Sequence, residues 1–158
     1  MTTAIGITEQ HRQEVATVLS ILLADEFVLY TKTRNAHWNV EGADFHDKHI
    51  FFEGQYQQLD EIVDSVAERI RSIGHYAPGT LSSFVKLTHL TEKTEQQNNS
   101  TGFINDLLEE HESIIVFIRK NIDDFNNKYN DAGSGDFITG LIKEHEKMAW
   151  MLRASLNK

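Results

Sequence analysis

The sequence has no cysteine, a single proline, and fewer basic than acidic residues. Each shortage excludes a kind of bond, structure or binding partner. With no cysteine, neither disulfide bonds nor thiolate metal ligands are available, so any metal site must use imidazole and carboxylate groups. No uninterrupted apolar stretch approaches the roughly 18 residues of a membrane span. The first residues also lack the basic region and apolar run of a secretory signal. We therefore expect a cytoplasmic protein that makes no membrane contact.

Basic residues are outnumbered, with 15 Lys and Arg against 24 Asp and Glu and a formal net charge of −9. Residues 1–11 contain neither Lys nor Arg. Affinity for nucleic acid comes mainly from basic side chains that neutralise phosphates. We therefore expect no DNA binding through the amino-terminal tail.

Four amphipathic stretches predict an all-α protein. Their apolar residues recur at spacings of three to four, and the only proline, Pro78, lies outside them. The stretches span about 9–37, 44–73, 100–129 and 136–156. We predict a single domain over residues 1–158, built as a four-helix bundle behind a short flexible tail of residues 1–8.

The long connection between the second and third helices, about 74–99, contains a small apolar group: Leu81, Phe84, Val85 and Leu87. This group predicts a short extra helix. Because so few turns are not stable alone, we expect it to pack against the second helix or at a subunit interface. The polar end of the connection offers Ser100 or Thr101 as an N-cap for the third helix.

Several potential metal ligands share one face of the second helix. At 100° per residue, His49, Glu53, Asp64 and Glu68 fall within an arc of about 100°. However, Glu53 and Asp64 are roughly 16 Å apart along the helix axis, whereas metal ligands lie about 2 Å from their ion. One chain therefore cannot gather all four. An antiparallel, two-fold pair of these helices would bring each histidine end to the partner's carboxylate end and create two identical sites.

His37 ends the first predicted helix, and a short loop would let its side chain converge with that of His49. Alternatively, Asp64 and Glu68 bind no metal and simply lie on a solvent-exposed helix face together with nearby arginines. None of the eight histidines follows a glutamate by three residues, so the sequence does not predict a di-iron site inside one bundle.

Two further histidines, His111 and His145, lie on apolar stripes and are interpreted as core residues. Trp38, beside His37, is interpreted as an interface residue or an oxidisable shield for the centre. Glu61 is a further candidate metal-binding carboxylate on the second predicted helix.

Two motifs resemble those of the Dps family, the ferritin-like mini-ferritins of bacteria. The first is A-H-W-N-V-x-G-x-x-F-x-x-x-H over residues 36–49, and the second is D-x-x-A-E-R over residues 64–69. The resemblance implies a ferritin-like bundle and a ferroxidase centre shared across a subunit two-fold. The residues that match its ligands are His37, His49, Glu53, Asp64 and Glu68. Glu53 stands where the family often has aspartate.

The resemblance also implies a function. We expect oxidation of Fe²⁺, preferably by hydrogen peroxide, and storage of ferric mineral inside a hollow shell of twelve subunits. Asp131 and Asp136 lie in the segment that lines iron pores in this family. The alternative function is a DNA-binding, nucleoid-protecting shell with little ferroxidase role.

Overall fold

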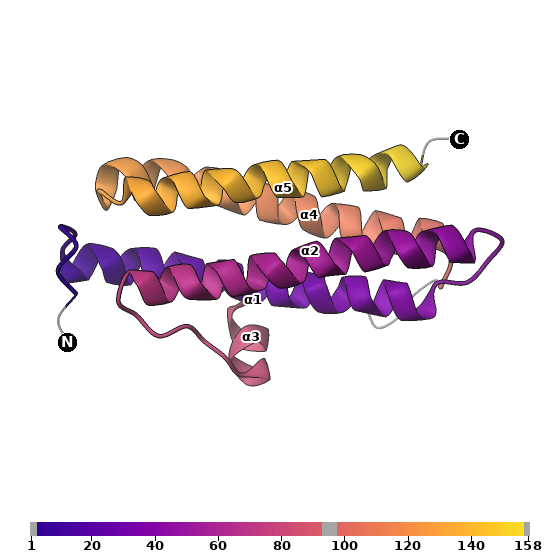
Figure 1. The fold of residues 1–158 in the computed structure, drawn as a ribbon, viewed down its shortest axis with the longest axis horizontal. Helices are drawn as coiled ribbons and strands as arrows, with labels where there is room; N and C mark the ends of the chain where they lie inside the picture. The colour runs from indigo at the N-terminus through magenta and orange to yellow at the C-terminus, as the bar shows by residue number, and fades with distance from the viewer. Residues whose placement is uncertain (1–2, 93–97, 157–158) are drawn as a thin grey trace.

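A computed structural model of the chain describes residues 3–92 and 98–156. Four long helices lie side by side and form the bundle (Figure 1): α1 (Glu9–Asn39), α2 (Phe45–Ser72), α4 (Ser100–Asp123) and α5 (Ala132–Leu156). A short helix, α3 (Leu81–Leu87), lies across the side of the bundle. The fold is therefore the predicted four-helix bundle with one extra helix in its long connection.

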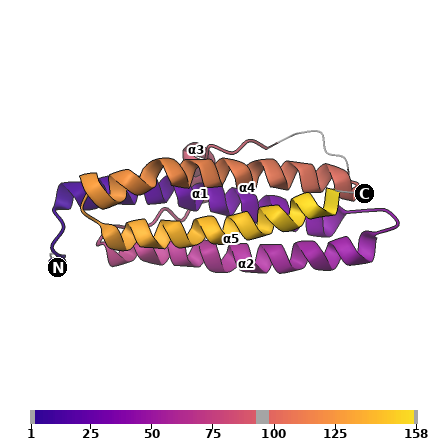
Figure 2. The same ribbon diagram turned by 90° about the horizontal axis from the view of Figure 1, so that it is seen from above.

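The bundle consists of two helical hairpins. α1 packs against α2, α4 packs against α5, and α1 also contacts α4. Figure 2 shows the four helices as two layers, with α1 and α4 in one and α2 and α5 in the other. Each long helix contributes a stripe of fully buried aliphatic and aromatic side chains to one continuous core, including Leu19, Leu59, Ile114 and Leu152. Their three-to-four spacing explains why periodicity predicted all four helices.

The short helix α3 packs on α1 rather than on the second helix, while its predicted place at a subunit interface stays a prediction. Phe84 is buried, and its ring stacks on Phe27 of α1 with the centroids 4.5 Å apart. Leu81 and Val85, by contrast, remain 70% and 68% exposed. Phe84 and the partly buried Leu87 therefore attach α3 to the bundle and leave its outer face apolar.

Two helix ends differ from the prediction. The N-cap of α4 is Asn99, whose side chain accepts the Gly102 backbone N–H, rather than Ser100 or Thr101. The loop expected before the last helix is largely helical, since a π-helical turn, η1 (Asp124–Lys128), follows α4 and α5 begins already at Ala132. Short polar side chains compete for helix caps, which is why sequence alone places such ends poorly.

No helix in the described ranges combines the length and the apolar character needed to cross a membrane.

Candidate metal centre

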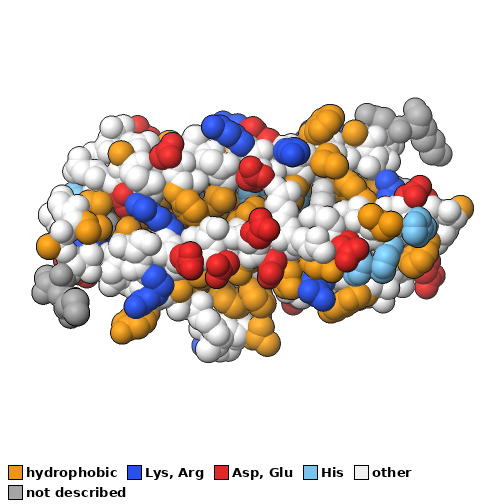
Figure 3. Space-filling model, viewed as in Figure 1, with side chains coloured by type: hydrophobic (Ala, Val, Ile, Leu, Met, Phe, Trp, Pro, Cys, Tyr) orange, Lys and Arg blue, Asp and Glu red, His pale blue; other side chains and the backbone are white. Residues whose placement is uncertain are grey.

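The turn between α1 and α2 brings together the two histidines predicted to converge. His37 lies in the last turn of α1, and His49 lies near the start of α2. Their imidazole rings stack with centroids 3.8 Å apart and an interplanar angle of 22°. His37 is 9% exposed, while His49 is partly exposed. Histidine side chains reach the surface at this end of the molecule (Figure 3).

Each of these rings is oriented by the backbone of the other residue. Nδ1 of His37 lies 2.8 Å from the His49 carbonyl oxygen, and Nδ1 of His49 lies 2.8 Å from the His37 carbonyl oxygen. A carbonyl oxygen only accepts, so both Nδ1 atoms carry the proton and donate it. In the neutral ring this leaves the lone pair on Nε2. Metal-binding histidines are usually held by a hydrogen bond of this kind, with one ring nitrogen donating to a fixed acceptor and the other free to coordinate the metal.

Aromatic residues of α1 and α2 and one arginine of α1 support this pair. The Tyr56 ring meets the His37 ring edge-on, with centroids 5.2 Å apart and an interplanar angle of 72°. The Arg34 guanidinium lies 4.6 Å from the Tyr56 centroid and 5.2 Å from that of Trp38. It also donates to the Tyr30 hydroxyl at 2.8 Å, a bond that raises the pKa of Arg34. Trp38 itself is 61% exposed, so it covers Arg34 but remains open to solvent or a neighbouring subunit.

The three carboxylates lie on the same helix at two different levels. Because α2 is continuous from Phe45 to Ser72, Glu53 lies one turn beyond His49, Asp64 lies roughly 16 Å further along the axis, and Glu68 lies one turn beyond Asp64. Glu53 is partly exposed, while Asp64 and Glu68 are exposed. Across the described ranges, no three His, Asp or Glu side chains are gathered closely enough to hold a metal ion. The chain thus brings together the two histidines but not the complete predicted ligand set.

Acidic side chains also gather on the face formed by α2 and α5, where a row of them crosses the middle of the view in Figure 3. A groove of about 640 Å³ separates the two helices on this face, and Glu61, Asp136 and Glu144 line it. Lys147 is the basic residue in its lining. The groove is therefore a surface suited to cations.

The two aspartates of the predicted pore segment have different surroundings. Asp131 is 2% exposed, pairs with Arg69 at 3.2 Å, and accepts the backbone N–H of Ser134 at 2.9 Å and its hydroxyl at 2.6 Å. This is N-cap geometry for α5. Asp136 is exposed on the first turns of α5. Within the single chain, Asp131 has a structural role, and only Asp136 presents its charge to solvent.

His111 and His145 lie in the core, as predicted from their apolar stripes, but their acidic partner was not predicted. Both histidines are fully buried, and so is Glu26 of α1. His145 lies 2.8 Å from Glu26 and 2.9 Å from His111. A signal for this cluster was present in the sequence, since the Asp25-Glu26 pair interrupts an apolar run of α1 from Leu22 to Leu29.

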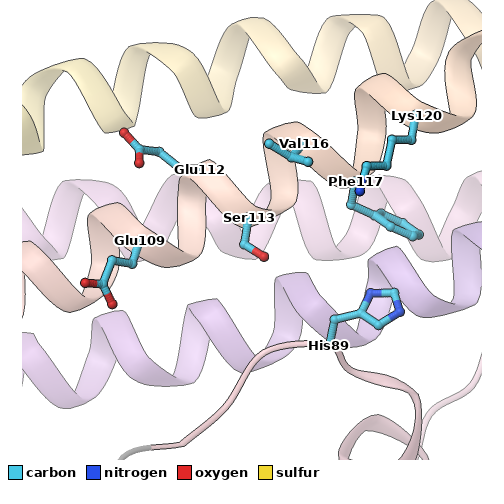
Figure 4. A pocket seen from close by; sticks show the side chains of 7 residues that line it. All are labelled: His89, Glu109, Glu112, Ser113, Val116, Phe117 and Lys120. Atoms are coloured by element: carbon cyan, nitrogen blue, oxygen red, sulfur yellow. The ribbon is translucent and has the colours of Figure 1, made fainter.

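A second groove, of about 610 Å³, lies beside α4 and also contains histidine and glutamate (Figure 4). His89 faces Phe117, with ring centroids 5.0 Å apart, and its Nδ1 lies 3.4 Å from the buried Asp25 carboxylate. Glu109 and Glu112 extend from α4 away from the imidazole. These groups do not converge, so the groove lacks the geometry of a metal site.

Comparison with known proteins supports a specific classification. The family model described as a ferritin-like domain matches residues 16–158. An uncharacterised low temperature-induced protein of Nostoc is 39% identical over 150 residues, which cover 95% of this chain and 84% of that protein. DNA protection during starvation protein 2 of Bacillus anthracis is 32% identical over 146 residues, covering 92% of this chain and 99% of that protein.

The fold leads to the same class. The crystal structure of a Dps protein from Vibrio cholerae, described as a member of a superfamily of ferritin-like diiron-carboxylate proteins, is 29% identical. It superposes with a TM-score of 0.91 over 99% of this chain and 97% of that one. A Dps protein from Bacillus brevis superposes with a TM-score of 0.88 at 27% identity, over 96% of this chain and all of that one. The chain belongs to the Dps family of ferritin-like proteins.

Proposed function

We propose that this protein oxidises Fe²⁺ and stores the ferric product, using centres shared between two-fold related subunits of a dodecamer. The observation that carries the proposal is the His37–His49 pair. Its reciprocal backbone hydrogen bonds leave both Nε2 atoms free to coordinate iron. A pair that merely filled space would not need both rings fixed in this tautomer.

The remaining ligands are assigned by the geometry of α2. His37, His49 and Glu53 of one chain would bind iron together with Asp64 and Glu68 of the partner subunit. The continuous helix keeps the two groups of ligands apart within one chain, and an antiparallel pairing of two α2 helices would bring them together. The exposed Asp64 and Glu68 are available for such a contact. Glu53, one methylene longer than the aspartate common in the family, would reach the same ion from one turn beyond His49.

The donor set suits iron oxidation because carboxylate oxygens are hard ligands that favour Fe³⁺ over Fe²⁺. Hydrogen peroxide is the proposed oxidant. Two bound Fe²⁺ ions each give one electron, the O–O bond breaks, and two protons complete two water molecules. Because both electrons arrive together, no hydroxyl radical is released. Trp38, beside His37, would limit the access of solvent to the reacting ions.

Storage would follow on the acidic face of α2 and α5. We assign this face to the interior of the shell because Glu61, Asp136 and Glu144 line one groove there and can bind ferric ions as they leave the centre. Asp136 would also contribute to the route by which Fe²⁺ reaches the interior, since its carboxylate is exposed where α5 begins. Asp131, which caps α5, would fix the backbone of that segment.

DNA protection is the second candidate function, because relatives in Bacillus anthracis and Helicobacter pylori carry that name. In this chain the net charge of −9 and the absence of Lys and Arg from residues 1–11 disfavour direct DNA contacts. Protection by removal of iron and peroxide would need no such contacts.

The proposal is tested by complementation between two inactive variants. The first carries His37→Ala and His49→Ala, and the second carries Asp64→Ala and Glu68→Ala. Each alone should lose rapid oxidation of Fe²⁺ by peroxide, followed by ferric absorbance. In a mixed dimer, one of the two shared sites regains every ligand while the other loses the four substituted ones, so activity should return.

Two controls accompany this experiment. His46→Ala and Asp47→Ala remove an exposed histidine and an exposed carboxylate from the same end of α2 and should leave oxidation unchanged. Size-exclusion chromatography should confirm that each variant still assembles. Mixed dimers that form but remain inactive would contradict the shared site.

A further inference from the structure

A cluster of three ionisable side chains lies in the bundle core, remote from the candidate metal centre. Glu26 of α1, His111 of α4 and His145 of α5 are each 0% exposed. They form a chain in which His145 Nε2–H donates to Glu26 Oε1 at 2.8 Å and His145 Nδ1 lies 2.9 Å from His111 Nδ1. Glu26 Oε2 and His111 Nε2 have no hydrogen-bond partner among the described residues. Buried groups of this kind are costly, so their presence in an otherwise apolar core needs an explanation.

The contact between the two imidazoles fixes the number of protons in the cluster. A hydrogen bond between two Nδ1 atoms requires one proton, with one nitrogen donating and the other accepting. If both rings were fully protonated, both nitrogens would be donors, the bond would be lost, and two cations would face each other at about 3 Å in a dry core. A charged His111 would also carry a proton on Nε2, for which the described residues offer no acceptor, so the dry core disfavours the charge and favours a neutral His111.

The charged side chains described around the cluster already have partners and do not stabilise a protonated His111. Lys32 of α1 pairs with Asp106 and Glu110 of α4, and it also donates to the Thr91 carbonyl oxygen. From α2, the buried polar side chain is the neutral Gln55, which donates to the Met148 carbonyl oxygen. The one acidic group of the cluster, Glu26, already accepts from His145. Burial, followed by the charge of His145, lowers the pKa of His111 well below its ordinary value.

We propose that Glu26, His145 and His111 form an acid-sensitive lock that holds α1, α5 and α4 together while His111 is neutral and releases them when it is protonated. The lock joins the two helical hairpins, because Glu26 belongs to the α1–α2 hairpin and both histidines belong to the α4–α5 hairpin. Its release would separate the two halves of the bundle rather than unravel one helix.

The direction of the pH effect follows from the two states of His111. In the unfolded chain it takes up a proton near pH 6.5, whereas in the folded bundle it does so only at much lower pH. Unfolding therefore consumes a proton below about pH 6.5, and the unfolding constant rises by up to about tenfold for each further unit of acidification. Above that pH, unfolding consumes no proton at this residue and the contribution is constant.

The test compares the full-length, iron-free protein with His111→Gln, which keeps a polar amide but cannot titrate. Urea unfolding is followed at pH 7.5 and 5.5 at one protein concentration. Over this range the unfolding constant of the parent should increase about tenfold more than that of the variant. His46→Gln, which removes an exposed histidine, should retain the full pH dependence of the parent. Equal pH dependence in the parent and His111→Gln would overturn the proposal.

A second measurement covers the case in which His111→Gln does not fold. Deuterium exchange at imidazole C2, read by mass spectrometry between pH 5 and 8, reports the protonation of each histidine in the folded parent. His111 should show no transition in this range. A His111 transition near pH 6.5 in the folded protein would show that the bundle tolerates the charge and would overturn the lock.

Discussion

The molecule contains two histidine pairs, and each connects two helices in a different way. His37 and His49 join α1 to α2 at the end of the bundle, and each ring donates to a backbone carbonyl oxygen of the other residue. His111 and His145 join α4 to α5 in the core, and their rings bond to each other. In the first pair the backbone satisfies one nitrogen and leaves the other for a ligand. In the second pair the rings bond to each other, and the unpartnered His111 Nε2 is sealed in the core, out of reach of a ligand.

The comparison shows that the partner of Nδ1 decides what a histidine pair can do. A backbone carbonyl oxygen is a fixed acceptor that never gains or loses a proton, so it holds the first pair in a metal-binding tautomer. Another imidazole is a titratable partner, so the second pair responds to pH. Solvent exposure separates them further, since His49 is partly exposed and the core pair is sealed.

The largest expected effect tests the first pair. His49→Leu should lower the initial rate of iron oxidation by peroxide roughly 100-fold or more, because even the loss of an outer-shell partner weakens metal sites 10- to 100-fold. Stability should change little, since His49 is not part of the core. Ferric absorbance in stopped flow measures the rate, and His46→Leu serves as the exposed control. A rate close to that of the parent would remove His49 from the centre.

The second effect tests the core pair through stability. His145→Leu leaves the buried Glu26 carboxylate without its partner and should destabilise the protein by about 3–5 kcal/mol. The triple variant Glu26→Leu, His111→Leu and His145→Leu should recover most of this loss, because it replaces the whole cluster with apolar groups. Urea unfolding measures both. If the triple variant is less stable than His145→Leu, the unpaired Glu26 carboxylate is not what destabilises His145→Leu.

A smaller effect is expected for two aspartates, the buried Asp131 just before α5 and the exposed Asp136 within it. Asp131→Ala removes an N-cap and an ion pair with Arg69, and should cost about 1–2 kcal/mol. Asp136→Ala should change stability by less than about 0.5 kcal/mol but slow iron oxidation at low salt, with a weaker effect when the Debye length falls to about 8 Å. Unfolding and oxidation assays on both variants separate the roles. Equal oxidation rates for Asp136→Ala and the parent at every salt concentration would exclude Asp136 from the route.

The smallest expected effect concerns DNA. In a gel shift with plasmid at about 0.15 M salt, the protein should leave the DNA unretarded, because its amino-terminal residues supply no cationic contacts. A variant with lysines in place of Thr2 and Thr3 is the matched positive control and should bind more strongly. Tight retention of DNA by the parent, in the absence of divalent metal, would contradict this prediction.

Much of the fold could be predicted from the sequence because helix periodicity and core burial coincide. Residues such as Leu19 and Leu59 recur at helical spacing and are fully buried, so their pattern located the long helices. The convergence of His37 with His49 was predicted from a short loop and is confirmed by their stacked rings. The shared ligand set remains a prediction, since it depends on a second chain.

The remaining details depend on contacts between residues far apart in the sequence. The association of Glu26 with His145 links positions 119 residues apart, and no local pattern contains it. The packing of α3 on α1 likewise includes a ring contact between Phe27 and Phe84, which lie far apart in the sequence. The early start of α5 follows from the burial of Asp131 against Arg69. Sequence periodicity describes one helix at a time, whereas these features belong to pairs of helices.

The reciprocal hydrogen bonds of the first histidine pair have a consequence for the loop that joins α1 to α2. Loops usually tolerate insertions and deletions. Here the loop of residues 40–44 sets the position of the His49 imidazole relative to that of His37. If an added residue became part of α2 ahead of His49, it would rotate His49 by about 100° and shift it by about 1.5 Å. The backbone bond from Glu41 to Asn98 also anchors this loop to the segment before α4. Its length should therefore be among the least variable dimensions in functional relatives, and an engineered insertion site is better placed elsewhere.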